Sequence, residues 1–167
     1  MTEFEVQVDG VLTKVAELLT ARNWRMATAE SCTGGWIAKC CTDVAGSSEW
    51  FDRAYVTYSY RAKEQMLGVS HDDLVKHGAV SEEIAWQMAT GAKRLSKAAV
   101  VVSATGIAGP GGGMPGKPVG LVHFGWCIAD RSAVCDAAAF EGDRKSVRQQ
   151  TVLHALQGII SRIGVQA

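Results

Sequence analysis

The chain lacks an excess of charge of either sign, and it lacks a long apolar segment. Its 17 lysines and arginines balance its 17 aspartates and glutamates, so the formal net charge is zero. Binding to nucleic acid or to an anionic membrane through the overall field needs a basic excess. No apolar run reaches the roughly 20 residues of a transmembrane helix, and residues 1–7 have no basic residue of a secretory signal. We therefore expect no nucleic-acid or membrane partner, whereas a small anionic substrate needs only one local positive group.

Cysteine is present without the spacing of a metal site. The five cysteines are odd in number, and no two of them have the Cys-x-x-Cys spacing that zinc sites use twice. Reduced thiols in a cytoplasmic protein are the simplest interpretation. We expect a cytoplasmic protein with no metal and no cofactor.

Histidine is scarce, and none of the four histidines lies beside a glycine turn. His71 and His77 fall in a polar helical region, His123 in a predicted strand and His154 on the last predicted helix. A Ser-His-Asp triad or a Cys-His pair needs a histidine as its base. A surface or core role is favoured for each of the four, so histidine-based catalysis has little support.

Helical and strand patterns alternate along the chain. Apolar spacing and capping residues predict helices over 9–22, 33–43, 61–67, 70–77, 81–95 and 143–163. Strand-forming runs cover 24–29, 55–58, 99–103, 119–128 and 133–140, the last two as a hairpin. This alternation predicts an α/β fold, and we expect residues 1–167 to form a single three-layer α/β/α domain with a mixed central sheet.

The segment Ala29–Gly35 is predicted to be a tight turn between a strand and a helix. Such a turn places Ser31 at the positive end of the helix dipole, next to backbone N–H groups that can hold an oxyanion. The same pattern is typical of a serine that only caps the helix, and on position alone the cap is the commoner role. Cys32 beside it is the stronger intrinsic nucleophile. The turn therefore predicts either a nucleophile or a helix cap.

A basic residue lies where the second predicted strand passes into a helix. Lys63 can act as a base only if burial, or a cation such as Arg61, lowers its pKa. Tyr58, at the end of the strand, is placed to hold or relay a proton. The alternative is a solvated lysine on a short helix, which is the commoner case.

A glycine-rich loop, Thr105–Gly113, follows the apolar strand 99–103. Backbone N–H groups of such a loop can hold a phosphate or an oxyanion. The loop lacks the Gly-Lys-Ser/Thr of a P-loop and does not form the GxGxxG pattern that opens a helix. Arg144, at the start of the last helix, is either a bidentate phosphate ligand or an exposed first-turn arginine. Each of these signals is weak by itself.

Taken together, the motifs resemble the C-terminal domain of the competence/damage-inducible CinA family, whose members include nicotinamide-nucleotide amidases. The resemblance runs from about residue 10 to residue 160 and rests on several motifs in the same order. They are Ala29–Gly35, Ala45–Ser48, Val56–Ser59 with Lys63, Gly78–Glu82, Thr105–Gly112, Lys117–Gly120 and Phe140–Arg144.

The resemblance implies an amidohydrolase that converts nicotinamide mononucleotide (NMN) to nicotinate mononucleotide and ammonia in pyridine nucleotide recycling. It implies Ser31 as the nucleophile, Lys63 as its base and Tyr58 as an assisting hydroxyl, with N–H groups at the helix start around the oxyanion. It also implies a homo-oligomer, in the stand-alone form that lacks the N-terminal domain of some relatives. The substrate contacts we expect are Cys32, Thr33, Gly34, Ser48, Thr105, Gly106, Gly109 and Arg144.

Two other functions remain open. A nucleotide-binding regulatory module without catalysis would keep the glycine-rich loop and Arg144 but would not need Lys63. A cysteine hydrolase would use Cys32, although no histidine partner is evident. Release of ammonia separates the first alternative from an amidase, and loss of activity on alkylation of the thiol identifies the second.

Overall fold

The structure, a computed structural model, describes residues 1–164, and its elements follow the predicted order. The helices are α1 (Glu3–Thr20), α2 (Trp36–Asp43), α3 (Tyr60–Leu67), α4 (His71–His77), α5 (Glu82–Ser96) and α6 (Arg144–Gly164), with a short 3-10 helix, η1, at Ser47–Glu49. The strands are β1 (Met26–Glu30), β2 (Phe51–Val56), β3 (Val100–Gly106), β4 (Leu121–Ile128) and β5 (Val134–Ala139).

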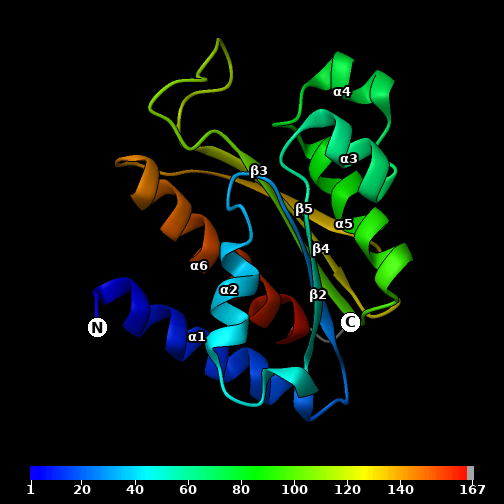
Figure 1. The fold of residues 1–167 in the computed structure, drawn as a ribbon, viewed down its shortest axis with the longest axis vertical. Helices are drawn as coiled ribbons and strands as arrows, with labels where there is room; N and C mark the ends of the chain where they lie inside the picture. The colour runs from blue at the N-terminus through cyan, green and yellow to red at the C-terminus, as the bar shows by residue number, and fades with distance from the viewer. Residues whose placement is uncertain (165–167) are drawn as a thin grey trace.

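The five strands form one mixed sheet in the order β2-β1-β3-β4-β5. β1 pairs in parallel with β2 and β3, and the β3–β4 and β4–β5 pairs are antiparallel. The three parallel strands therefore end at the same edge of the sheet, which is the upper edge in Figure 1. In open α/β sheets, ligands bind beyond the carboxyl ends of the strands, so this edge positions the site.

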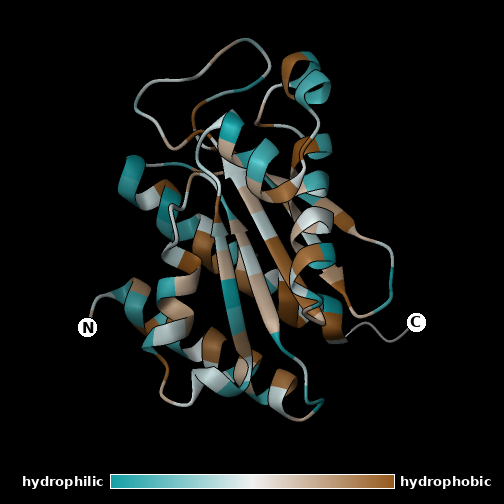
Figure 2. Cartoon of the chain, turned by 45° about the vertical axis from the view of Figure 1, so that its right-hand side comes forward, coloured by the Kyte–Doolittle hydropathy of each residue, from teal (hydrophilic) through white to brown (hydrophobic). Residues whose placement is uncertain are grey.

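Helices cover both faces of the sheet. α1, α2 and α6 lie on one face, and α3, α4 and α5 lie on the other (Figure 1). Each helix layer closes its own apolar core against the strands, and Figure 2 shows apolar residues on the inner elements and hydrophilic residues on many outer turns. Core side chains include Leu12, Ile37 and Leu156 on the first face and Leu67, Ile84 and Met88 on the second. The predicted three-layer α/β/α fold with a mixed sheet is confirmed.

Two helix starts differ from their predicted positions. α1 begins at Glu3 rather than near residue 9, because Thr2 and Glu5 form a capping box that the apolar spacing did not reveal. α2 begins at Trp36 rather than at residue 33, because Gly34 and Gly35 have φ angles of +59° and +94°, outside the helical range. The prediction that Ser31 caps this helix is therefore wrong.

None of the described helices combines the length and the apolar character that crossing a membrane requires.

Candidate active site

Ser31 lies directly after β1, between the ends of β2 and β3. Its N–H donates to the Ala104 carbonyl of β3 at 3.0 Å, and its own carbonyl accepts from the Gly34 N–H at 3.1 Å. These bonds fix the turn that carries the hydroxyl. Ser31 keeps 8% of its surface exposed, so its side chain is reached from the edge of the sheet.

Lys63 reaches Ser31 from α3, on the α5 side of the sheet. Its Nζ donates to Ser31 Oγ at 2.8 Å, to the Thr57 carbonyl at 2.7 Å and to the Tyr58 carbonyl at 3.3 Å. The residue is fully buried, and burial lowers the pKa of its amine to about 8. Arg61 plays no part in this lowering, so the cation effect considered for it is wrong. A neutral Lys63 keeps two N–H bonds to carbonyls and directs its lone pair at the Ser31 hydroxyl, which is the geometry of a nucleophile with its base.

Glu30, the last residue of β1, occupies the N-terminus of α2. Its fully buried carboxylate accepts five hydrogen bonds, all between 2.7 and 3.1 Å. The donors are the Thr28 and Thr33 hydroxyls and the N–H groups of Gly35, Ile37 and Ala38. The positive end of this helix is therefore neutralised by a carboxylate of the chain itself. The N–H groups of Gly35, Ile37 and Ala38 are therefore not free to hold an oxyanion.

Other N–H groups beside Ser31 are free to hold an oxyanion. Within the described part of the chain, the N–H groups of Cys32 and Thr33 donate no hydrogen bond. They belong to the turn that directly follows the Ser31 hydroxyl, where backbone donors serve acyl transfer.

Arg148 of α6 holds this turn, and it is not among the residues predicted from the sequence. Its Nε donates to the Cys32 carbonyl at 3.0 Å, and its Nη2 donates to the Thr33 carbonyl at 2.9 Å. Its guanidinium lies 5.0 Å from the ring centre of Trp36. The available signal was its spacing of four residues from Arg144, which puts both side chains on one side of the helix.

Cys32 does not have the environment of a nucleophile. Its thiol is buried against the apolar core on the α2 side, and burial raises its pKa to about 12. A thiolate is therefore a negligible fraction near neutral pH, and only the thiolate attacks.

Arg144 joins two segments at the mouth of the site. Its Nη1 donates to the Gly109 carbonyl at 2.9 Å, and its Nη2 donates to the Tyr58 hydroxyl at 3.4 Å. Tyr58 is 63% exposed and lies between Lys63 and Arg144. Its carbonyl accepts from the Lys63 amine, and its hydroxyl accepts from the Arg144 guanidinium. The expected contact of the Tyr58 hydroxyl with the Ser31–Lys63 pair is replaced by this contact with Arg144.

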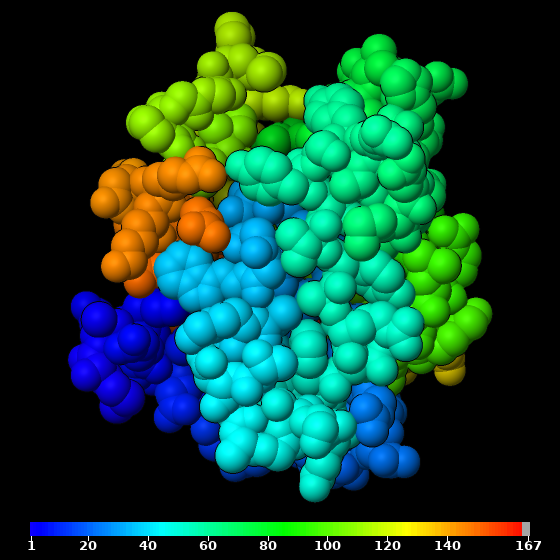
Figure 3. Space-filling view, viewed as in Figure 1, coloured from blue at the N-terminus to red at the C-terminus, as the bar shows by residue number. Residues whose placement is uncertain are grey.

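An open cleft of about 600 Å³ adjoins the turn. Figure 3 shows a recess beside this turn. The loop 107–120, which contains most of the glycine-rich loop, and the start of α6 face the segment before α3 across it. The cleft carries three cations and one carboxylate, which suits an anionic group. It is lined by Ala108, Pro110, Val119, Gly142, Asp143, Arg144, Lys145 and Arg148.

Four of the residues expected to contact the substrate have roles in the fold. The Thr105 hydroxyl is buried and donates to the Ala79 carbonyl at 2.8 Å, and the Thr33 hydroxyl is bonded to Glu30. A Cβ at Gly106 would lie 2.8 Å from the Leu121 carbonyl oxygen, so the packing of β3 on β4 requires glycine there. Gly34 supplies the positive φ of the turn beside Arg148.

Ser48, one of the expected substrate contacts, lies far from Ser31 within this chain. Ser48 lies in η1, just before β2, and the first residue of β2 pairs with Met26 at the start of β1. Ser31 follows the other end of β1, five residues after Met26. Because a strand rises about 3.3 Å per residue, the whole length of β1 separates the two positions. Ser48 is therefore at the opposite edge of the sheet from Ser31 of the same chain.

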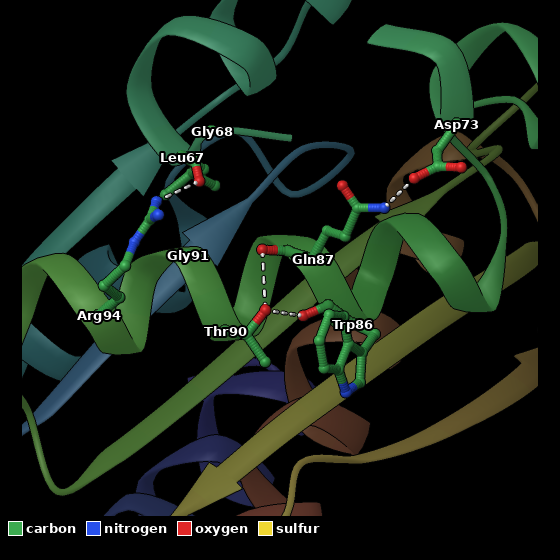
Figure 4. Close-up of a pocket in the computed structure, with 8 residues that line it drawn as sticks. All are labelled: Leu67, Gly68, Asp73, Trp86, Gln87, Thr90, Gly91 and Arg94. Carbon is green, nitrogen blue, oxygen red and sulfur yellow. Dashed lines mark hydrogen bonds between the residues drawn. The ribbon is translucent and has the colours of Figure 1, made fainter. Parts of the chain in front are cut away.

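A second hollow lies between α5 and the α3–α4 pair (Figure 4), with a volume of about 310 Å³. Its polar side chains are bonded within the groove: Arg94 donates to the Leu67 carbonyl at 3.2 Å, and Gln87 donates to Asp73 at 2.7 Å. Neither Ser31 nor Lys63 lines it. Over residues 1–164, no group of three or more histidine, cysteine, aspartate or glutamate side chains is arranged to hold a metal ion. The edge at Ser31 is thus the best candidate for the active site.

Comparison with known proteins gives a consistent set of relatives. Residues 9–163 match the family model described as the CinA C-terminal domain. The chain is 50% identical over 144 residues to nicotinamide-nucleotide amidohydrolase PncC of Escherichia coli, covering 86% of this chain and 87% of that protein. It is 49% identical to a CinA-like protein of Syntrophobacter fumaroxidans over 85% of this chain and 33% of that longer protein. The crystal structure of competence damage-inducible protein A (ComA) from Klebsiella pneumoniae superposes with a TM-score of 0.91 at 34% identity, covering 96% of this chain and 99% of that one.

Proposed function

Because the chain belongs to the CinA C-terminal domain family, we propose that it hydrolyses the carboxamide of NMN, with Ser31 as the nucleophile and Lys63 as its base. Relatives named nicotinamide-nucleotide amidohydrolase, at about 50% identity over most of the chain, support the reaction. The observation that supports the mechanism is the 2.8 Å hydrogen bond between Lys63 Nζ and Ser31 Oγ.

Acylation begins with the Ser31 hydroxyl. Ser31 Oγ attacks the carboxamide carbon while its proton passes to neutral Lys63, and the carbonyl oxygen becomes an oxyanion. In this proposal the N–H groups of Cys32 and Thr33, which have no other acceptor in the described structure, donate to that oxyanion. Lys63 then gives the proton to the amide nitrogen, the C–N bond breaks, and ammonia leaves an ester on Ser31.

Deacylation uses the same groups in reverse. Water attacks the ester carbon while Lys63 accepts a proton from it. The tetrahedral intermediate collapses, Ser31 regains its proton from Lys63, and nicotinate mononucleotide leaves. No other general base is needed, since one amine serves both steps.

The basic cleft is suited to the phosphate of the substrate. Arg144, Lys145 and Arg148 offer guanidinium and ammonium groups, and guanidinium groups bind phosphate bidentately. Arg148 also holds the Ser31 turn, so binding of the phosphate is linked to the position of the nucleophile. Asp143 is engaged elsewhere, because its carboxylate accepts from the Ser146 N–H at the start of α6.

The location of the protein and its self-association also belong to the proposal. The four buried free thiols, Cys32, Cys40, Cys41 and Cys127, suit a reducing compartment and support a cytoplasmic location. Self-association into a homo-oligomer is proposed on the resemblance alone.

The direct test is incubation of the purified chain with NMN. We expect stoichiometric release of ammonia and nicotinate mononucleotide, measured by an ammonia assay and by chromatography. Cys32→Ala is expected to keep this activity, because its thiol is not ionised. Tight binding of NMN without ammonia would favour the regulatory module, and loss of turnover in Cys32→Ala with an intact fold would favour a cysteine hydrolase.

The activity should depend on the protonation of Lys63. Its pKa of about 8 lies below the ordinary value for lysine, so roughly a tenth of the amine is neutral at pH 7. We expect kcat/KM to rise about tenfold per pH unit below pH 8 and to level off above it, in a pH–rate profile. A profile that is flat between pH 6 and pH 9 would contradict Lys63 as the base.

A further inference from the structure

One buried hydroxyl beside the catalytic pair has no partner. Thr57 is fully buried, and its Oγ1 makes no hydrogen bond. Among the described residues, the only other buried side-chain polar atom of this kind is Nε of Arg162, far along α6. A buried hydroxyl without a hydrogen-bond partner destabilises the fold. We therefore expect a step of the reaction in which the Thr57 hydroxyl gains a partner.

Thr57 is the strand neighbour of Ser31. Glu30 of β1 pairs with Val56 of β2, and the Thr57 N–H donates to the Glu30 carbonyl at 2.8 Å. The pairing therefore continues by one residue, which places Thr57 beside Ser31. Side chains at paired positions leave a sheet on the same face, here the face that α3 covers with Lys63. The Thr57 carbonyl already holds the Lys63 amine at 2.7 Å.

The reaction changes the partners of the Lys63 amine. Before the reaction three oxygens surround its Nζ: Ser31 Oγ and the carbonyls of Thr57 and Tyr58. In the neutral amine the two N–H groups donate to the carbonyls and the lone pair faces Ser31. When Ser31 Oγ bonds to the carboxamide carbon, the amine has just become an ammonium, and that oxygen is no longer a good acceptor. The third N–H of the ammonium then needs an acceptor until its proton passes to the amide nitrogen.

We propose that Thr57 Oγ1 is that acceptor, a positioning group that stabilises the Lys63 ammonium while the tetrahedral intermediate exists. The inference rests on the proposed function. The proton balance is unchanged: Ser31 loses a proton to Lys63, Lys63 gives it to the amide nitrogen, and Thr57 only accepts a hydrogen bond. Because Thr57 is fully buried, it acts through Lys63 and not on the substrate.

The test separates this role from a structural one. Thr57→Val keeps the shape of the side chain and removes the hydroxyl. We expect kcat for NMN to fall about 10- to 100-fold, the usual effect of losing a hydrogen bond to a charged group, with KM within twofold of wild type. The melting temperature should stay the same or rise, because an unpaired buried hydroxyl is lost. Thr57→Ser should restore most of kcat.

A matched control is Thr151→Val in α6. Thr151 is equally buried, but its hydroxyl donates to the Val147 carbonyl at 2.7 Å, away from the site, so its loss should leave kcat unchanged. Thr57→Val with wild-type kcat, or with a fall in kcat that accompanies a lower melting temperature, would overturn the inference. A wild-type chain that releases no ammonia from NMN would instead overturn the proposed function.

Discussion

Ser31→Ala is expected to lower kcat for NMN hydrolysis by roughly 10⁴-fold to 10⁶-fold, and Lys63→Met by a similar factor. The serine variant has no atom to form the ester, and the lysine variant has no base within reach of Ser31 Oγ. Since the two groups act as one unit, the double variant should be about as slow as either single variant, not slower by the product. Turnover is measured by ammonia release under saturating NMN.

Two checks separate lost chemistry from lost folding. Lys63→Met removes the amine and keeps an unbranched side chain suited to a buried position, so circular dichroism should show an unchanged fold. Lys39→Met is the matched control, because Lys39 is exposed on α2 and pairs with Asp43, so it should keep wild-type kcat. A Ser31→Ala protein with more than a tenth of wild-type turnover would refute the nucleophile assignment.

Glu30→Gln is expected to lower the free energy of unfolding by about 3 kcal/mol, measured by urea denaturation. All five partners of this carboxylate are donors, and an ionised carboxylate accepts at both oxygens. An amide replaces one oxygen by a donor that faces other donors, leaving buried N–H or hydroxyl groups without an acceptor. The helix start also loses the negative charge that its dipole favours.

The same substitution should reduce activity through the turn. Loss of the bonds to Thr33 and Gly35 frees the segment that follows Ser31, so kcat should fall even under conditions where the protein remains folded. Glu49→Gln, at an exposed position in η1, is the control and should change stability by less than about 0.5 kcal/mol. If Glu30→Gln were as stable as this control, Glu30 would not be the anchor of α2.

The fold could be predicted from the sequence because its signals are local. The apolar run before Thr105 and the caps at Ser70 and Ser81 each depend on neighbouring residues, and each lies where it was predicted. The start of α2 was missed because its cap is not local: Glu30 reaches it from the end of a strand, past two glycines that break the helix.

The site was harder to predict, since its contacts join distant parts of the chain. Arg148 binds carbonyls more than 110 residues earlier, and no spacing in the sequence reports such a contact. The unpaired hydroxyl of Thr57 was equally invisible, because it depends on strand register and burial. Ser48 belongs to a motif of the family but lies at the far edge of the sheet from Ser31 of the same chain, so its contact with the substrate stays a prediction.

The packing of α1 on α6 bears on how the molecule is made. The first helix finds its partner in the last, and the basic wall at Arg144 and Arg148 belongs to that same late helix. A chain emerging from the ribosome therefore exposes Ser31 and Lys63 long before the turn around them is held. Contacts so distant in sequence form slowly, and the growing chain leaves the apolar face of α1 uncovered until α6 has been synthesised. Activity should thus appear only after α6 has been made and has packed on α1 and on the turn that carries Ser31.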